Sequence, residues 1–163
     1  MLPVFKTVGG LTATLPSDRG IRICRCLKAP RQLVWDAHTQ PTLIRRWLLG
    51  PPGWTMPVCK VDLRVGGTFR YEWHNEKGLV MGLSGTYREV TVPERIADTQ
   101  AFDDDWTQGP YDTVLVLVEC KGWTDLTLDI VYASKDSRDL AASTPMLEGM
   151  EAGYARLDAI APQ

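Results

Sequence analysis

The sequence lacks an excess of either charge. Lysine and arginine number 18 against 20 aspartates and glutamates in 163 residues, so the formal net charge is only -2. Proteins that bind nucleic acids through the phosphate backbone carry a clearly positive field. We therefore expect no nucleic-acid partner.

A long hydrophobic run is also missing. The longest conspicuous one, 114-VLVLV-118, is far shorter than the roughly 20 residues that cross a bilayer. Pro3, Lys6 and a glycine pair interrupt the first ten residues before any signal-like segment develops. These absences predict a cytoplasmic protein with no membrane partner. The ordinary composition, 44% hydrophobic and 23% charged, fits a single domain over residues 1–163.

Clustered metal ligands are absent from the sequence pattern. Cys24 and Cys26 are two residues apart, but Cys59 and Cys120 stand alone and neither histidine is near a cysteine. No zinc-ligand quartet results from this spacing. The acidic run 103–105 lacks the alternating ligands and the glycine of a calcium loop. We expect free, mostly buried thiols, no metal and no cofactor.

Hydrophobic periodicity, together with proline and glycine positions, predicts the order of elements. Residues 11–28 fit a leading extended segment with a break at 16–20. Prolines suit the first turns of the predicted helices, and hairpin-length connections indicate an antiparallel sheet. The predicted helices span about 30–38, 41–47 and 144 onward, and the strands about 21–28, 57–65, 68–74, 79–90, 95–102, 112–120 and 124–133.

The segment 62-DLRVGGTFRYEW-73 combines a glycine pair with a row of aromatics. A phosphate-binding glycine loop precedes a helix, whereas this pair precedes a predicted strand, so we interpret Gly66 and Gly67 as a tight hairpin turn. Phe69, Tyr71 and Trp73 share one strand face and the polar residues between them share the other. The three rings therefore face the interior.

A sheet with one apolar face must be covered by another element. The C-terminal helix carries the only long apolar stripe, at Leu147, Met150, Tyr154 and Leu157. We predict an α+β protein in which a curved antiparallel sheet wraps around a long C-terminal helix, with two short helices after the first strand.

Several short motifs resemble the SRPBCC superfamily of START-like, helix-grip proteins, in its branch of homologues of the heat-shock-chaperone ATPase activator. Together they cover about residues 21–160 in the order and spacing of that family. The resemblance implies a pocket for hydrophobic small molecules between the sheet and the terminal helix. The matching residues are Ala29-Pro30-Arg31, Val34-Trp35-Asp36-Ala37, Gln40-Pro41, Arg46-Trp47, Gly50-Pro51, Asp62, Arg64, Gly66-Gly67, Phe69, Gly85, Tyr87, Glu89, Pro93-Glu94-Arg95, Gly122, Thr124, Met150-Glu151 and Gly153.

Strand and helix phase predict which side chains face this pocket. On the strand at 112–120 the predicted inward residues are Val114, Val116 and Val118. Large aromatics and methionines dominate the predicted set, which suits a hydrophobic ligand. We predict a ligand-binding set of Trp47, Trp54, Phe69, Tyr71, Trp73, Met81, Tyr87, Val116, Leu126, Leu128, Tyr132, Met146, Met150 and Tyr154.

Apart from tyrosines, the predicted inward positions contain no titratable group. General acid–base catalysis needs a group whose pKa lies near the working pH, so we expect no catalytic residue. Arg25 and Glu89 are in phase with inward neighbours, and either an ion pair between them or a solvated end fits. His38 falls at a helix end and His74 on the outward face, where structural roles explain both.

Three functions are consistent with this inventory. The leading one is non-catalytic binding of an aromatic or polycyclic small molecule, oriented by tyrosine hydroxyls and indole N–H groups. The second is a polyketide cyclase-like or hydrolase-like enzyme that uses Tyr71 or Arg25 to orient a carbonyl. The third is a chaperone-linked interaction protein that uses the outer sheet face, and a homodimer is a further candidate assembly. Trp106 fits either a lid over the pocket or a protein contact.

Overall fold

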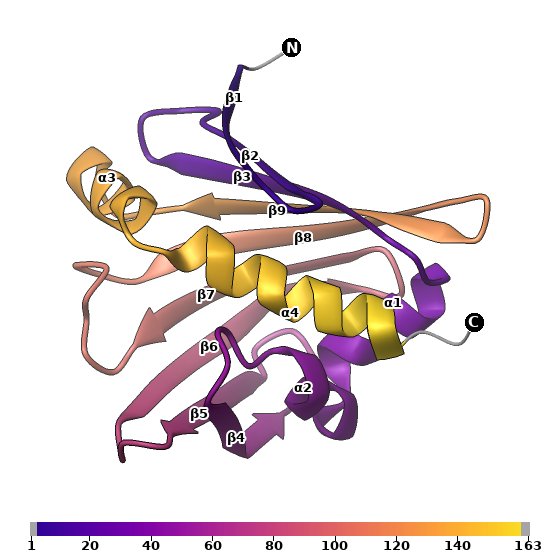
Figure 1. The fold of residues 1–163 in the computed structure, drawn as a ribbon, viewed down its shortest axis with the longest axis horizontal. Helices are drawn as coiled ribbons and strands as arrows, with labels where there is room; N and C mark the ends of the chain where they lie inside the picture. The colour runs from indigo at the N-terminus through magenta and orange to yellow at the C-terminus, as the bar shows by residue number, and fades with distance from the viewer. Residues whose placement is uncertain (1–2, 161–163) are drawn as a thin grey trace.

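The computed structural model describes residues 3–160 (Figure 1). Within these residues, nine strands and four helices follow one another. They are β1 (Val4–Val8), β2 (Leu11–Thr14), β3 (Gly20–Leu27), α1 (Arg31–Thr39), α2 (Pro41–Trp47), β4 (Trp54–Val61), β5 (Thr68–Asn75), β6 (Val80–Thr91), β7 (Arg95–Phe102), β8 (Tyr111–Cys120), β9 (Trp123–Val131), α3 (Lys135–Ser143) and α4 (Met146–Ile160).

All nine strands form one antiparallel sheet in the order β1-β2-β3-β9-β8-β7-β6-β5-β4. The sheet curves, and α4 lies across its concave side, with α2 beside it (Figure 1). The predicted α+β architecture, a curved antiparallel sheet around a C-terminal helix, is confirmed. Within residues 3–160, no helix is long and apolar enough to cross a membrane.

The core lies between α4 and the concave face of the sheet. Leu147, Tyr154 and Leu157 of α4 are buried, as the apolar stripe predicts. They pack into one cluster with inward residues of the strands and with Trp47 of α2. Burial of this stripe is the main reason why α4 stays on the sheet, because an isolated helix of this length is marginally stable in water.

Two parts of the fold were not predicted. Strand β1 pairs with β2, which lies in the predicted extended segment, and so extends the sheet at its edge, and α3 precedes the terminal helix. The start of α3 is fixed by Ser134, whose hydroxyl accepts a hydrogen bond from the Ser137 main-chain N–H at 3.0 Å. The sequence feature that could have predicted α3 is therefore the N-cap residue Ser134, ten residues before Thr144.

The predicted phase of β8 is wrong. Thr113, Leu115 and Leu117 face the interior, whereas Val116 is only half-buried and Val118 is 54% exposed. The run 114–118 is apolar at every position, so it contains no polar residue that marks the outer face. The polar residue that marks the outer face lies just before the run. It is the exposed Asp112, which is on the same strand face as Val116.

The glycine pair makes a turn between β4 and β5, as predicted. Gly66 has a φ of +83°, which an L residue adopts only at a cost. A Cβ atom at Gly67 would lie 2.1 Å from the Asp62 carbonyl oxygen, so this position excludes every side chain. The Gly66 N–H donates to the Tyr87 carbonyl, and β5 follows directly. No helix begins there to hold a phosphate.

Candidate functional site

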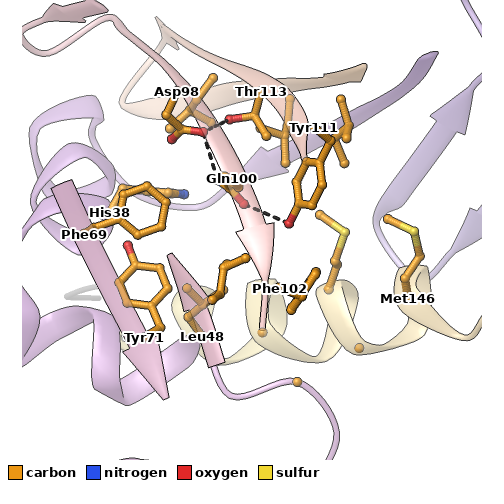
Figure 2. A pocket seen from close by; sticks show the side chains of 18 of the residues that line it. His38, Leu48, Phe69, Tyr71, Asp98, Gln100, Phe102, Tyr111, Thr113 and Met146 are labelled. Carbon is orange, nitrogen blue, oxygen red and sulfur yellow. Dashed lines mark hydrogen bonds between the residues drawn. The ribbon is translucent and has the colours of Figure 1, made fainter. Parts of the chain in front are cut away.

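A cavity of about 300 Å³ lies between the concave face of the sheet and α4. Aromatic, aliphatic and methionine side chains form most of its wall, and Asp98, Gln100 and Thr113 contribute polar atoms. Figure 2 shows strand residues on one side of the cavity and Met146 of α4 on another. A second hollow of about 310 Å³ adjoins the cavity and shares Gly50, Trp73 and Met150 with it.

Strand register explains which residues meet on the cavity floor. In one row across the sheet, Tyr87 of β6 pairs with Asp98 of β7, and Asp98 pairs with Thr113 of β8. In the neighbouring row, Gly85 pairs with Gln100 and Gln100 pairs with Tyr111. Residues two apart on a strand share a face, so both rows point toward α4.

Phe69 extends the second row and lies over Gly85. The two residues are register partners, and a Cβ atom at Gly85 would lie 2.2 Å from two carbons of the Phe69 ring. The absence of a side chain at Gly85 therefore lets this ring lie down on the sheet. Phe69 also contacts the Tyr71 and Tyr87 rings, at centroid distances of 4.9 and 5.3 Å.

The predicted site residues fall into three groups. Trp54 and Met81 line the adjoining hollow rather than the cavity. Leu126 is 1% exposed but belongs to the packed core, and Val116 lies in the opposite strand phase, where Leu115 takes its predicted place on the wall. The predicted residues that line the cavity are Trp47, Phe69, Tyr71, Trp73, Tyr87, Leu128, Tyr132, Met146, Met150 and Tyr154.

Two indole N–H groups of the cavity wall are already engaged. Trp47 Nε1 donates to the Ala37 carbonyl and Trp73 Nε1 donates to the Leu48 carbonyl, both at 2.7 Å. These bonds fix the two rings in the cavity wall. The expectation that these indole N–H groups orient a ligand is therefore wrong for Trp47 and Trp73.

Asp98 is a titratable group of the cavity that the sequence reasoning missed. Its side chain is only 6% exposed. Thr113 Oγ1 and Gln100 Nε2 both donate to Asp98 Oδ1, at 2.6 and 3.0 Å, and the Tyr111 hydroxyl donates to Gln100 Oε1 at 3.0 Å (Figure 2). Burial raises the pKa of the Asp98 carboxyl, and the Thr113 and Gln100 hydrogen bonds oppose this rise.

His38 is the second titratable group that was not expected on the cavity wall. Its Nδ1 lies 2.7 Å from the Val34 carbonyl oxygen, which makes Nδ1 the protonated nitrogen of the neutral ring. The ring packs against Trp47 at a centroid distance of 4.8 Å. Burial lowers the pKa of His38 from 6.5 to about 4, so the imidazole is neutral at physiological pH.

Tyrosine hydroxyls supply the remaining polar groups. For Tyr71, Tyr87 and Tyr154 no hydrogen-bond partner is found within the described part of the chain, although each residue is at least nine-tenths buried. Burial raises the pKa of all three hydroxyls well above the usual value for tyrosine. They are therefore neutral groups that can donate or accept a hydrogen bond.

Arg25 and Glu89 do not pair with each other. Arg25 Nε lies 2.9 Å from Glu151 Oε2, and Arg25 Nη1 lies 3.0 Å from Asp158 Oδ2, so this arginine ties β3 to α4. Glu89 pairs with Arg95 at 2.9 Å. Neither of the alternatives predicted for Arg25 is correct, because the arginine meets the terminal helix instead of a strand end.

The loop after β7 brings Trp106 to the cavity, where its ring lies 5.2 Å from that of Phe102. Asp103 is held by two hydrogen bonds from Arg70, both 2.7 Å. Across residues 3–160, no cluster of acids, histidines and cysteines could hold a metal ion. The thiols are free, as expected, but only Cys59 is buried, in contrast to the expectation of mostly buried thiols.

The sequence matches the protein family described as "Activator of Hsp90 ATPase homolog 1-like protein" over residues 28–161. This match covers both short helices, the cavity-forming strands and the terminal helix. The chain belongs to this family. The predicted family resemblance is confirmed.

Solved structures show the same fold as this member of the Hsp90 ATPase activator homolog 1-like family. A protein from Rhodobacter sphaeroides is 29% identical, with a TM-score of 0.86 over 92% of this chain and 97% of that one. A protein from Chromobacterium violaceum is 27% identical, with a TM-score of 0.77 over 90% of this chain and 100% of that one. An AHSA1-like protein from Aeromonas hydrophila is 22% identical, with a TM-score of 0.65 over 83% of this chain and 90% of that one.

Among curated proteins, none matches this family member significantly. Structural likeness at these levels of identity fixes the backbone but not the chemistry of the cavity. The function must therefore be argued from the side chains that line the cavity of this chain.

Proposed function

We propose that the protein binds a hydrophobic, ring-containing small molecule in the cavity between the sheet and α4. The observation that carries this proposal is the cavity of about 300 Å³, whose wall combines aromatic rings with tyrosine hydroxyls that lack a partner among the described residues and keep accessible surface. Ligand sites in proteins are typically concave and mostly apolar, with a few polar groups that fix orientation. A core that only fills space would have no reason to leave several hydroxyls unpaired.

The rings of the β5 row give the ligand its main contact surface. Phe69, Tyr71 and Trp73 follow one another along the cavity, and Tyr71 meets Trp73 edge to face at a centroid distance of 5.8 Å. Aromatic pairs in such offset or edge geometry contribute roughly 0.5–1.5 kcal/mol beyond the area that they bury. A planar ligand that inserts beside this row gains both the burial of its apolar area and the aromatic contacts.

The adjoining hollow supplies the route by which a ligand enters. It is lined by the loop after α2, with Leu49 and Pro51, and by Trp54 at the start of edge strand β4. Gly149 of α4 lies where hollow and cavity meet, and a Cβ atom there would make only ordinary contacts, 3.6 Å from Pro51 Cδ. A larger side chain at this position would narrow the junction without straining the backbone.

The test uses N-phenyl-1-naphthylamine, a neutral aromatic probe whose fluorescence rises in apolar surroundings. We expect saturable binding to the protein, and an affinity at least about tenfold lower in Gly149→Leu, because the new side chain occupies the junction. Leucine is a better helix former than glycine by up to about 1 kcal/mol, so the variant should remain folded. Ala155→Leu adds the same side chain at an exposed position of α4 and serves as the matched control. Equal affinity in both variants contradicts the proposal.

A second candidate is an enzyme of the cyclase or hydrolase type that uses the same cavity. It is favoured by the position of Asp98 and His38 on the cavity wall, because carboxyl and imidazole groups are the usual general acids and bases. Turnover of an aryl ester that Asp98→Asn removes would favour this candidate over simple binding.

A further inference from the structure

The hydrogen bonds around Asp98 all run toward one of its two oxygens. Thr113 and Gln100 donate to Oδ1, and Tyr111 donates to Gln100, which directs the Gln100 amide nitrogen to the carboxyl. No partner is found for Oδ2 within residues 3–160. Thr14 Oγ1 is the one side-chain oxygen or nitrogen of these residues that is both fully buried and unpartnered. Because it is unpartnered but is not in that fully buried class, Asp98 Oδ2 retains accessible surface. Asp98 lines the cavity, so we take this surface to face the cavity.

His38 presents a second acceptor on the same wall. Because Nδ1 carries the proton that the Val34 carbonyl accepts, Nε2 carries a lone pair. The described residues provide no donor to His38 Nε2. This atom is unpartnered without being fully buried, so it too retains accessible surface. The two fixed polar atoms that are free in the cavity are thus both hydrogen-bond acceptors when Asp98 is ionised.

No positively charged side chain lies on the cavity wall beside these acceptors. Among the described residues that line the cavity there is neither a lysine nor an arginine. Arg88 donates to the Asp98 main-chain carbonyl at 3.2 Å, but its side chain is 45% exposed and does not line the cavity. Burial raises the pKa of the Asp98 carboxyl, and the Arg88 charge opposes this rise without outweighing it. The free donors that remain, tyrosine hydroxyls and the Trp106 indole, carry no charge.

We propose that this cavity selects ring compounds that carry a hydrogen-bond donor, such as a hydroxyl or an amine, because Asp98 Oδ2 accepts a hydrogen bond from that donor. The same carboxylate oxygen makes the cavity reject ligands that are carboxylates. This inference rests on the proposed small-molecule binding and adds the chemical class of the ligand. A hydrogen bond to a charged partner is worth more than a neutral one, and a carboxylate ligand is repelled by the like charge of Asp98 when no cation lines the cavity. The ligand's apolar ring would lie along Phe69 and Tyr71, with its donor toward β7.

The experiment compares three probes of one shape, naphthalene, 2-naphthol and 2-naphthoate, by quenching of tryptophan fluorescence at pH 7.5. For the unmodified protein we expect 2-naphthol to bind at least about tenfold more tightly than naphthalene. We expect 2-naphthoate to bind more weakly than naphthalene. Naphthalene itself reports on the cavity alone, since it has no polar group.

Asp98→Asn separates recognition from structure. Thr113 and Gln100 can still donate to Oδ1, so the amide nitrogen takes the place of Oδ2 and presents a donor to the cavity. The preference should reverse, with 2-naphthol weakened by about tenfold, 2-naphthoate strengthened and naphthalene unchanged. If Asp98 had only a structural role, the substitution would change the affinities for the three probes by a similar factor. Asp125→Asn, on exposed Asp125 of β9, is the matched control and should leave all three affinities unchanged.

The outcomes distinguish the two proposals. If naphthalene binds but the three affinities are similar in the unmodified protein and in Asp98→Asn, small-molecule binding stands and the donor rule is overturned. If none of the probes binds, both proposals fail. Tighter binding of 2-naphthoate than of naphthalene by the unmodified protein also overturns the donor rule.

Discussion

The two sides of helix α4 treat charge in opposite ways. On the side that faces β1 to β3, Glu151 and Asp158 are both paired with Arg25, which is only 8% exposed. On the side that faces the cavity, α4 presents Met146, Gly149 and other uncharged residues toward a wall that holds Asp98 without a cation. Burying an ion costs several kcal/mol unless it is paired. A carboxyl that is buried without such pairing therefore points to function, whereas the paired set points to structure.

The largest expected effect comes from breaking the paired side. Arg25→Met leaves the Glu151 and Asp158 carboxylates, 14% and 18% exposed, without their cation. We expect the free energy of unfolding to fall by about 3–5 kcal/mol in urea denaturation. Arg64→Met removes an exposed pair with Asp62 and should cost less than about 1 kcal/mol. Similar losses in both variants would mean that the Arg25 cluster behaves as a surface ion pair.

An intermediate effect is expected from His38 when the pH is lowered. Because its folded pKa of about 4 lies below its unfolded value of 6.5, the neutral ring stabilises the fold above pH 6.5, and this stability is lost as the pH falls toward 4. The loss should reach about 3 kcal/mol. In His38→Asn this part of the pH dependence should disappear, and in His74→Asn, at an exposed position, it should remain. Urea denaturation at pH 7 and pH 4.5 measures it, and parallel curves for all three proteins would contradict the assignment.

The smallest expected effect concerns Asp98, on the cavity side of α4, and the dependence of stability on pH. Because burial raises the pKa of Asp98, its protonated form stabilises the fold at low pH, and this contribution is lost as the pH rises through the folded pKa. Asp98→Asn, which cannot ionise, should therefore gain stability relative to the unmodified protein between pH 3.5 and pH 7.5, measured by urea denaturation at both pH values. Asp125→Asn, at an exposed position of β9, should show no such gain. A constant difference across this range would mean that Asp98 carries no ionisation cost.

The sequence predicts β5 and α4 well because polar residues mark their outer faces. Arg70 and Glu72 separate the inward rings of β5, and the resulting phase is correct for Phe69, Tyr71 and Trp73. In β8 every residue from 114 to 118 is apolar, so periodicity cannot choose between two phases, and the choice of Val116 was wrong. Burial of one face or the other is decided there by the neighbouring strands.

Asp98 was missed for a different reason. It lies in 95-RIADTQAF-102, where Ile96 and Phe102 share its phase, so the alternation placed an acid among inward apolar residues. That signal was readable, but an aspartate in a strand is ordinarily a sign of the outer face. Its hydrogen bonds come from β8 and from Gln100, and pairings between strands are set by the fold rather than by local sequence.

The glycines of the cavity have a consequence for the range of ligands that this backbone can hold. At Gly85 the missing side chain gives the Phe69 ring its place, and at Gly149 the missing side chain keeps the junction wide. Both positions lie within regular elements, so a substitution at Gly149 changes the width of the junction while the strands and the helix keep their course. Under the binding function proposed above, one or two atoms at such a position set the size of the ligand, and the sheet need not be rebuilt to change it.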